Sequence, residues 1–504
     1  MEPHKRVVVN TLAQNIRSIL NICLSLYSTR IVLDALGRSD FGIYSLVGGV
    51  VAMLGFITNA MVVSTQRHLS FSYGQHDTRY IHKVFANAVI LHIILGLLLF
   101  VVLLCLKPLI FNTGILNIAS NRIDEASVVY LIMISSLFVS VITAPYRALF
   151  IARENIIYIS IIDVIDGVLK FALVFLLYDI AFDRLIAYAL IMTGIACFNF
   201  FAFSIGSKLK YEESCIVPSF KEVDRSEIKR MGTFAGWTIY STGCIIGRNQ
   251  GMSVILNHFF GVVINSAYGI AMQVSSAVMF VAQSVMNAMN PQIVKAEGMG
   301  NRSQMLNRAE SSCKYSFLLL SLVVIPIVSE MPYILDAWLK EVPEHAVMFC
   351  RFILIAALID QLTMGLATAN QAIGKIRNYS LIINSTKILT LPVVWICLSL
   401  GFQVEYAMWC YLCLEMLCAL MRLPYLRFTA GLSVRHFVKN VFLRVSLPVL
   451  LMVTVCWGCT HFLEFRLRFM LTAVLSVIMG GLTIWFCGFT QDERCMMLNM
   501  IRKR

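Results

Sequence analysis

Charged residues are scarce in this chain of 504 residues: they make up 14% of it, whereas 59% of the residues are hydrophobic and the mean hydropathy is +0.78. A soluble globular protein carries about 25% charged residues. Apolar runs of about twenty residues, each long enough to cross a bilayer as a helix, recur along the whole length. The strands of a membrane barrel would instead alternate apolar and polar residues. The composition therefore predicts an all-α integral membrane protein.

The sequence also lacks the signatures of catalysis. It contains no GxxxxGK[ST] phosphate loop, which argues against direct ATP coupling. It shows no pairing of a nucleophile with a base, and its loops are too short for a catalytic domain. Two CxxC pairs, Cys410/Cys413 and Cys456/Cys459, lie in apolar stretches without further ligands, so we expect no metal site and no cofactor. These absences predict a protein that is not an enzyme.

We expect about fourteen transmembrane helices. Pro326 and Pro332 make the ninth the least regular of them. No cleavable signal peptide is evident, because the first apolar stretch is too long and lacks a small-residue cleavage site. The predicted spans are residues 11–36, 42–66, 84–106, 125–149, 157–178, 185–206, 231–256, 264–290, 315–331, 346–371, 379–400, 405–427, 441–462 and 468–488.

The basic residues behind the net charge of +13 are distributed unevenly. If the N-terminus is cytoplasmic, Lys and Arg gather on the cytoplasmic side, in segments 207–230, 291–314 and 422–444 and in the C-terminal tail. Cytoplasmic loops of membrane proteins show this asymmetry. Topology therefore accounts for the positive charge, and we expect both termini in the cytoplasm and no nucleic-acid partner.

The chain repeats itself weakly. Residues 41–61 are echoed by 267–289, "LKPLIF" at 106–111 by "EMPYIL" at 330–335, and "ARENIIYISIID" at 152–163 by "GKIRNYSLIIN" at 374–384. The offsets are all about 220–227 residues, and six spans per half give both halves the same orientation, which is a parallel repeat. The repeat predicts four parts: a six-helix lobe (1–206), a cytoplasmic linker (207–230), a second six-helix lobe (231–427), and two additional helices with a cytoplasmic tail (428–504).

The paired lobes, "ALGRSDFGIYSLVGGVV" after the first span and "PYILDAWLKEVP" after the ninth resemble the polysaccharide (O-antigen and capsule repeat-unit) flippases. These belong to the multidrug/oligosaccharidyl-lipid/polysaccharide exporter superfamily, and the likeness covers about residues 1–430. It implies two lobes around a central cavity that opens alternately to each side of the bacterial inner membrane. It also implies a cargo of undecaprenyl-pyrophosphate-linked oligosaccharide, moved to the periplasmic leaflet, with a polysaccharide polymerase and glycosyltransferases as associated proteins.

Span 1 carries two arginines, each of which costs about 2.5–3.5 kcal/mol in hydrocarbon. At about 100° per residue, Arg17 and Asn21 share a polar face with Asn10, Gln14, Ser25 and Ser28. Such a face must meet a watery cavity or another helix. Arg30 lies on the opposite face near the outer end, where Asp34 can pair with it. We therefore expect Arg17 and Asn21 to contact the cargo and Arg30 to be structural.

A second polar stripe follows span 8. Amides and hydroxyls can donate and accept hydrogen bonds, which suits sugar recognition. They suit helix–helix contacts in lipid as well. We expect Gln273, Gln283 and Asn287 to line the cavity, and packing stays open as the alternative. The stripe consists of Asn265, Gly269, Gln273, Ser276, Gln283, Asn287 and Asn290.

Arg248 in span 7 stands beside a small-residue ridge of Gly243, Gly247 and Gly251, along which a neighbouring helix can approach closely. No acid lies within one helical turn of Arg248. Its guanidinium could therefore take an anion from outside the helix, such as a diphosphate, for which it offers a planar fork of donors. A structural partner from another helix is the alternative.

Span 5 carries Asp163, Asp166 and Lys170 on one face, and Lys170 can pair with Asp166 within the helix. At the repeat offset, Lys387 in span 11 stands where Asp166 stands. Asp360 in span 10 and Glu415 in span 12 could neutralise it. These four acids either set helix packing through ion pairs or include a carboxylate that exchanges H⁺ or Na⁺ during transport.

Together these residues predict a flippase with a cationic interior. Arg17, Lys170, Arg248 and Lys387 would hold the diphosphate, the span-8 amides would meet the sugars, and the prenyl tail would stay among membrane lipids. An ion gradient or the membrane potential, worth about 2.3 kcal/mol per charge per 100 mV, would drive it. A lipid II flippase fits the same arginines. A cation-coupled multidrug exporter on the same fold would need an acidic, aromatic cavity. A membrane glycosyltransferase would need a larger catalytic loop.

Reporter fusions test this topology. Fusions after residues 70, 215, 300 and 433 should report a cytoplasmic location, and fusions after 115, 260 and 340 a periplasmic one, because Lys and Arg concentrate in the first set of loops. An inverted result at 300 alone would contradict the alignment of the two lobes.

Overall fold

Helices make up nearly all of the described chain. The computed structural model describes residues 3–52, 54–75, 77–112, 122–215, 224–339, 341–463, 468–491 and 493–495, and it contains no strand among them. Two compact units divide the chain: Val8–Ile239, which we call the N-terminal unit, and Tyr240–Arg504 with Met1–Val7, which we call the C-terminal unit. The protein is an all-α, multi-span membrane protein, as its composition predicted.

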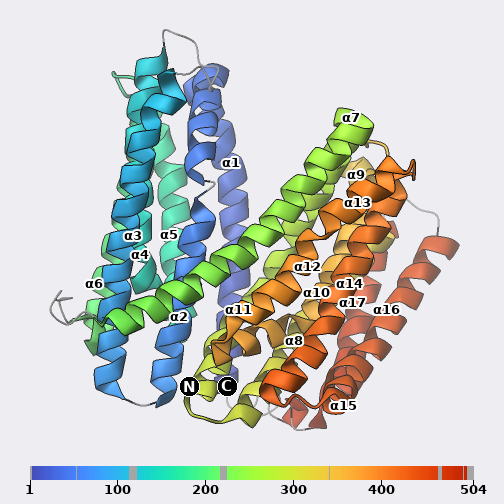
Figure 1. Cartoon of the computed structure of the whole chain (residues 1–504). Helices are drawn as coiled ribbons and strands as arrows, with labels where there is room; N and C mark the ends of the chain where they lie inside the picture. Colours follow the sequence, from blue (N-terminus) through green and yellow to red (C-terminus); the bar gives the residue numbers. More distant parts are fainter. Residues whose placement is uncertain are drawn as a thin grey trace. The chain divides into compact units, whose positions relative to one another are not determined.

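The N-terminal unit is a bundle in which α4 packs against α2, α3 and α6 (Figure 1). Capping residues explain where two of its helices begin. Asn155 accepts a hydrogen bond from the Tyr158 amide at the start of α5, and Asp183 accepts from Leu185 and Ile186 at the start of α6. Its elements are α1 (Pro3–Ala52), α2 (Gly55–Gln75), α3 (Thr78–Asn112), α4 (Ile123–Ala152), α5 (Ile156–Val174), η2 (Phe175–Tyr178), α6 (Arg184–Lys210) and η3 (Glu212–Ser214).

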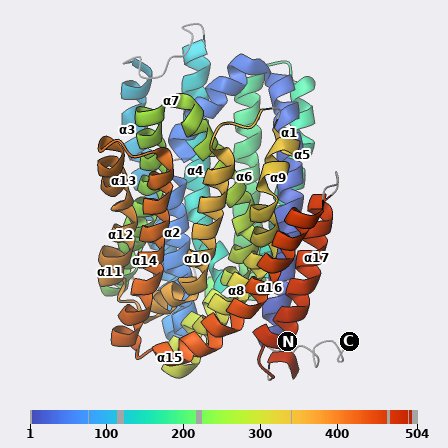
Figure 2. The ribbon, with the colours of Figure 1, turned by 90° about the vertical axis from the view of Figure 1, so that its right-hand side faces the viewer.

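In the C-terminal unit, α10 packs against α8 and α14, while α16 and α17 pack on α8 (Figure 2). Three π-helical turns, η5, η6 and η7, interrupt its later helices. Its elements are α7 (Arg225–Gly298), α8 (Arg302–Ser329), α9 (Met331–Trp338), α10 (Ala346–Ile373), α11 (Ile376–Tyr379), η5 (Ser380–Asn384), α12 (Ser385–Ile388), α13 (Thr390–Ser399), α14 (Val404–Ala430), α15 (Val434–Phe437), η6 (Val438–Phe442), α16 (Leu443–Phe462), α17 (Arg468–Thr483) and η7 (Ile484–Gly488).

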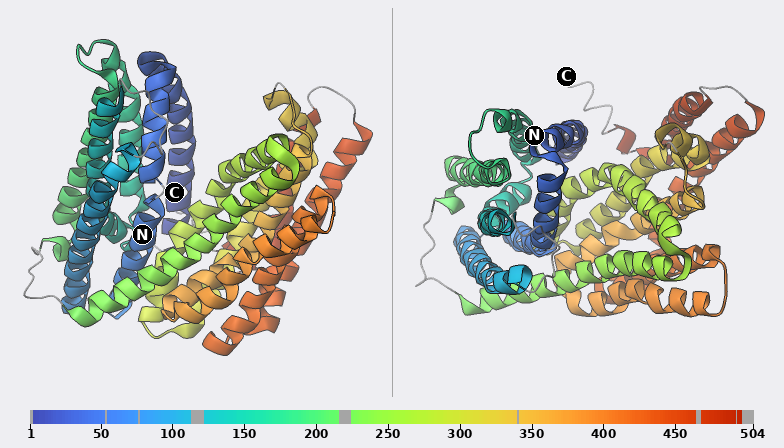
Figure 3. Two further views of the ribbon diagram at one scale, coloured as in Figure 1. Left: turned by 45° about the horizontal axis from the view of Figure 1, so that its top comes forward. Right: turned by 90° about the horizontal axis from the view of Figure 1, so that it is seen from above.

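The helix α7 belongs to both units, because the division falls between Ile239 and Tyr240. Its first turns belong to the N-terminal unit, where the Ser64 hydroxyl donates to the Met231 carbonyl at 2.9 Å. The segment expected as a linker, 207–230, therefore includes the ends of two helices, α6 and α7. The two views in Figure 3 show how α7 continues from its first turns into the C-terminal unit.

One glycine in each unit breaks a long helix in the same way. Gly37 in α1 has φ 77° and ψ 169°, and Gly261 in α7 has φ 78° and ψ −171°. Only glycine adopts this backbone region readily, because a Cβ would clash there. The two positions are 224 residues apart, which agrees with the repeat offset read from the sequence. The same kink therefore separates the first and second spans of each half.

Ten helices of the described chain are long and apolar enough to cross a membrane. The four remaining predicted spans also fall on helix: the part of α1 before Gly37, the rest of α1 with α2, α5 with η2, and the part of α7 before Gly261. Three of them carry predicted site residues: Arg17 and Asn21, Lys170 with the acids of α5, and Arg248. The count of fourteen spans stays a prediction.

The structure corrects one predicted loop. Residues 291–314 were expected to form a cytoplasmic loop, but α7 continues to Gly298 and α8 begins at Arg302. Asn301 caps α8 by accepting from the Gln304 amide, which fixes the start of that helix. Pro326 lies in the last turn of α8, where it removes one backbone hydrogen bond and only a few helical residues follow it. The ninth span is therefore a regular helix of 28 residues.

Two ion pairs connect α17 and the residues after it to α8, one directly after the last residue of α8 and one near its middle. Glu330, which is 2% exposed, accepts from Arg468 Nε at 3.0 Å and Nη2 at 2.9 Å, and from Thr472 at 2.9 Å. Near the middle of α8, Lys314 Nζ lies 2.7 Å from both oxygens of Glu493. Burial raises the pKa of the Glu493 carboxyl, but the Lys314 charge outweighs it and holds the pKa below its usual value.

We expect Glu330→Gln to loosen α17. The charge-assisted hydrogen bonds from Arg468 would be lost, at a cost of about 1.5–3 kcal/mol. Amide exchange in Arg468–Thr483 should then accelerate at least about tenfold, while α3 of the N-terminal unit keeps its wild-type rate. Glu344→Gln, at a glutamate that is 77% exposed, is the control. Unchanged exchange in α17 would contradict the role of this contact.

Candidate functional site

A carboxylate between two arginines is the centre of the N-terminal unit. Asp163 of α5 accepts from Arg17 Nη1 of α1 at 2.6 Å. It also accepts both arms of the Arg147 guanidinium of α4, at 2.9 Å on one oxygen and 2.7 Å on the other. Three helices thus meet at one acid. The polar face of span 1 does meet another helix, as the cost of burying it in lipid required.

The rest of that polar face is buried against the same region. Asn21 Nδ2 donates to the Asp163 carbonyl at 3.2 Å, and Asn10 Nδ2 donates to the Glu154 carbonyl at 2.9 Å. Asn21 therefore has a structural contact with α5 in addition to the cargo contact expected of it. The Arg30 side chain, expected to pair with Asp34, lies outside the described residues; Asp34 accepts from the Tyr178 hydroxyl at 2.7 Å.

The second acid of α5 faces a different set of groups. Asp166 pairs with Lys170 at 2.7 Å, as the i,i+4 spacing predicted, and accepts from Asn199 of α6 at 2.6 Å. The Lys170 side chain is 46% exposed, whereas Asp166 is 16% exposed. Lys170 therefore keeps donors directed away from Asp166, which leaves them able to meet a ligand.

Cavities open beside these charges within the N-terminal unit. One of about 440 Å³ is lined by Arg147, Asp166 and Lys170, together with a series of neutral polar groups. Another of about 260 Å³ is lined by Asn21, Asp166 and Lys170. The neutral polar groups of the larger cavity, which come from α2, α4 and α6, are Thr58, Asn59, Ser136, Ser140, Thr143 and Asn199.

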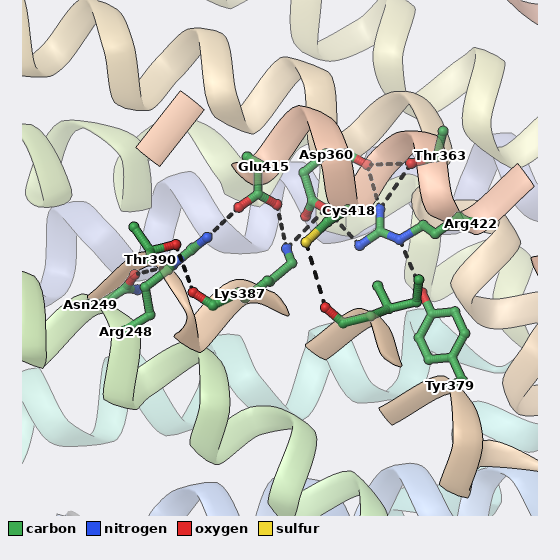
Figure 4. Close-up of polar contacts among 11 residues, drawn as sticks. Arg248, Asn249, Asp360, Thr363, Tyr379, Lys387, Thr390, Glu415, Cys418 and Arg422 are labelled. Carbon is green, nitrogen blue, oxygen red and sulfur yellow. Dashed lines mark hydrogen bonds and ion pairs between the residues drawn. The ribbon is translucent and has the colours of Figure 1, made fainter. Parts of the chain in front are cut away.

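The C-terminal unit holds a second buried charge network (Figure 4). Glu415 of α14 accepts from Arg248 of α7 and, at 2.5 Å, from Lys387 of α12. Lys387 also lies 3.1 Å from Asp360 of α10, and Asp360 lies 2.7 Å from Arg422 of α14. Both acids expected to neutralise Lys387 do contact it. The chain of five charged groups joins four helices.

Neutral groups complete this network at its Arg422 end. Arg422 Nε donates to the Tyr379 hydroxyl at 3.0 Å, and Arg422 Nη1 donates to the Thr363 hydroxyl at 3.0 Å and to the Asp360 carbonyl at 3.1 Å (Figure 4). Arg422 is 2% exposed. At the other end, the Arg248 guanidinium carbon lies 4.5 Å from the centre of the Tyr411 ring, where a cation is favoured.

Two backbone features bring these helices together. The π-helical turn η5 precedes Lys387 and inserts an extra residue into the helix, which rotates the following side chains relative to a regular helix. On α7, the close approach expected of the glycine ridge occurs at Gly251, where a Cβ would lie 2.5 Å from the Leu391 side chain of α13. A Cβ at Gly247 would make only an ordinary contact with Ile388, and one at Gly243 would meet nothing within 4 Å.

The structure gives Arg248 the partner from another helix that was its alternative interpretation. Glu415 lies 167 residues away in the sequence, so helical spacing could not reveal it. Arg248 and Lys387 are 6% and 4% exposed, and both contact Glu415. A cargo contact of either residue stays a prediction.

The span-8 stripe splits into two parts. Asn265 accepts from Ser253 at 2.6 Å and Asn290 from Thr368 at 3.1 Å, so these two amides serve packing. Gln273 and Gln283 are exposed on the C-terminal unit, and Asn287 is half-buried. Because an exposed amide side chain is costly in lipid, we expect Gln273 and Gln283 to face a water-filled space.

Sequence reasoning missed two arginines of these networks. Arg147 falls within the predicted span 125–149, and Arg422 falls within the segment 422–444 that was expected on the cytoplasmic side. Both lie inside helices and contact acids. The signal that could have found them is the one used for Arg17: an arginine within an apolar run is costly and needs a counter-charge.

The pairing pattern limits what the acids can do. Asp163, Asp360 and Glu415 each contact two basic side chains, and only Asp166 contacts one. A carboxylate and two bases together carry a net charge of +1, which repels a further cation. Among the described residues, no group of three or more His, Cys, Asp or Glu side chains could hold a metal ion. Asp166 is thus the acid best placed to exchange an ion.

Charge balance in the C-terminal network is open to test. Glu415→Gln leaves Arg248, Lys387 and Arg422 with one acid and should lower stability by about 3–5 kcal/mol. Arg248→Gln/Glu415→Gln restores the wild-type excess of one positive charge and should recover part of that loss. Thermal unfolding in detergent measures both. Glu405→Gln, at an exposed position of α14, should stay within about 0.5 kcal/mol of wild type. A double variant less stable than Glu415→Gln would contradict charge balance as the cause.

No family model matches the sequence, and no curated protein matches it. Solved structures do match it at low identity. A MATE in the bent conformation has a TM-score of 0.74 at 13% identity and covers 86% of this chain and 96% of that chain. A multidrug resistance MATE family transporter of the MOP superfamily, in an outward-facing conformation, has a TM-score of 0.70 at 14% identity, with coverage of 86% and 96%.

A third match is a MOP superfamily transporter from Pyrococcus furiosus Vc1, described by a reverse polarity of its binding pocket that suggests a different function. Its TM-score is 0.70 at 14% identity, and it covers 86% of this chain and 96% of that chain. These matches extend over both units and are to transporters, not to enzymes. The chain is a multi-pass membrane protein with the fold of the MATE transporters of the MOP superfamily.

Proposed function

We propose that this protein is a flippase that moves a lipid-linked oligosaccharide, joined to its lipid through a diphosphate, from the cytoplasmic to the periplasmic leaflet by alternating access. The observation that carries the proposal is the N-terminal centre, where three basic side chains, Arg17, Arg147 and Lys170, face two acids, Asp163 and Asp166. The excess positive charge beside polar cavities favours an anionic cargo. Guanidinium groups match phosphate oxygens with two parallel donors.

The cavity lining supports a glycan next to the phosphate. Serine, threonine and asparagine side chains from three helices surround the space of about 440 Å³ beside Arg147. Each of these groups can donate and accept hydrogen bonds, as sugar hydroxyls require. Gln273 and Gln283 on the C-terminal unit would add contacts of the same chemistry. In this proposal, the long lipid tail would stay among membrane lipids, and the protein would lie in the inner membrane of a bacterium.

The same charges argue against the nearest rival on this fold. A multidrug exporter for cations would need carboxylates able to meet the drug, yet Asp163 is already held by two arginines. A reverse polarity of the binding pocket has been described for one transporter of similar fold. A lipid II flippase remains an alternative with the same phosphate chemistry.

The C-terminal network has a different role in this proposal. Four of its five charged side chains are buried, and Arg248 and Lys387 both contact Glu415, so we assign them to joining helices and not to direct cargo contact. If transport is coupled to an ion, Asp166 would exchange it, because Asp166 contacts a single base that is itself exposed.

Surface glycan in a strain lacking its own flippase tests the proposal at matched protein level. Arg17→Ala and Arg147→Ala should each reduce export at least about tenfold, because each removes charge-assisted hydrogen bonds worth about 1.5–3 kcal/mol. Arg79→Ala, at an exposed arginine of α3, and Arg30→Ala should leave export near wild type. Full export in both Arg17→Ala and Arg147→Ala would contradict an anionic cargo at this centre. Rescue of a lipid II flippase-depleted strain instead would favour the alternative.

A further inference from the structure

We propose that the Asp163 carboxylate occupies the binding position of an anionic group of the cargo, and that the cargo's diphosphate binds by replacing Asp163 on Arg17 and Arg147. These two arginines, which we call the two-arginine site, would then exchange an internal anion for an external one. The inference rests on the proposed function, because it names the group of the cargo that binds there.

The geometry at Asp163 is that of a bound oxyanion. Two parallel contacts from Arg147, at 2.9 and 2.7 Å, form the fork with which guanidinium holds a carboxylate or a phosphate. Arg17 adds a third donor at 2.6 Å to one of the same oxygens. A phosphate oxygen pair can accept from both guanidiniums in the same way, so the site needs no new donors to receive one.

The larger cavity gives access to the site through Arg147. Arg17 and Asp163 are 18% and 16% exposed, whereas the Arg147 side chain is 35% exposed and lines the cavity of about 440 Å³. Phe203 lines the same cavity, with its ring centre 5.5 Å from the Arg147 guanidinium carbon. An anion in the cavity would therefore reach Arg147 first and Arg17 after it. Lys170, on the wall of the same cavity, could hold a second phosphate.

Exchange of anions on the two-arginine site explains why Asp163 lies between Arg17 and Arg147. Two arginines inside a helical bundle without a counter-charge would be strongly destabilising, so the protein must supply an anion when none is bound. The internal carboxylate also weakens the binding of any external anion, because it competes for the same donors. A transporter must release its cargo, and a competing internal anion keeps that binding weak enough for release.

Asp166 provides a matched control on the same helix. Its exposed fraction, 16%, equals that of Asp163, and it lines the cavity that Arg147 also lines. Asp166 contacts one lysine and one asparagine, whereas Asp163 contacts two arginines. Removing its charge leaves the two-arginine site intact. If general cavity charge were the cause of anion binding, Asp163→Asn and Asp166→Asn would respond alike, because each variant raises the positive charge by one.

The test uses the purified full-length protein in detergent and inorganic pyrophosphate as the probe, against chloride at the same ionic strength. Asp163→Asn should have a lower unfolding temperature than wild type in chloride. Pyrophosphate should raise that temperature by about 5 °C or more in Asp163→Asn and by clearly less in wild type and in Asp166→Asn. Arg147→Gln added to Asp163→Asn should remove the response.

Each outcome decides the question. Equal shifts in Asp163→Asn and Asp166→Asn, or none in Asp163→Asn, would overturn the exchange. If Asp163→Asn is recovered poorly, the yield of monodisperse protein with and without pyrophosphate becomes the measurement, and equal yields would overturn the exchange as well. A pyrophosphate response in a protein that fails to export glycan would keep the two-arginine site and reject the proposed cargo. No response in a protein that exports glycan would reject the exchange alone.

Discussion

A charge inside a helical bundle in lipid must have a counter-charge within reach, and this requirement organises both units of the protein. In the N-terminal unit, Arg17, Arg147 and Lys170 meet Asp163 and Asp166. In the C-terminal unit, Arg248, Lys387 and Arg422 meet Glu415 and Asp360. Both centres hold three bases and two acids. Every contact except that of Asp166 with Lys170 joins different helices, so the charges that cost most also fix which helices pack together.

The two centres differ in what surrounds them. In the N-terminal unit the charges border cavities, and Lys170 and Arg147 are partly exposed to them. In the C-terminal unit, both acids lie between buried bases, and Arg248 also lies on the Tyr411 ring. The two centres therefore suit different purposes. The first has room beside it for a ligand, whereas the second holds helices in register.

The last two helices extend the C-terminal unit and are fastened to α8 by Glu330 with Arg468 and by Lys314 with Glu493. One contact lies directly after Ser329, the last residue of α8, and the other lies near the middle of that helix. Between the two ion pairs the contact is apolar, where Met452 and Cys456 of α16 pack with Ile325. Helices α16 and α17 thus pack on α8, although the internal repeat does not include them.

Local features of this protein could be read from the residue order. The apolar runs predicted helices at the right places, and the kinks at Gly37 and Gly261 are separated by the repeat offset read from the sequence. The pair of Lys170 with Asp166 followed from i,i+4 spacing. That pair depends on one helix and its period. The choice of partners between helices depends on packing instead: Arg248 and Glu415 lie 167 residues apart on α7 and α14, and only the packing of these helices brings them together. Arg147 meets Asp163 for the same kind of reason, and helical period alone could not assign that pair.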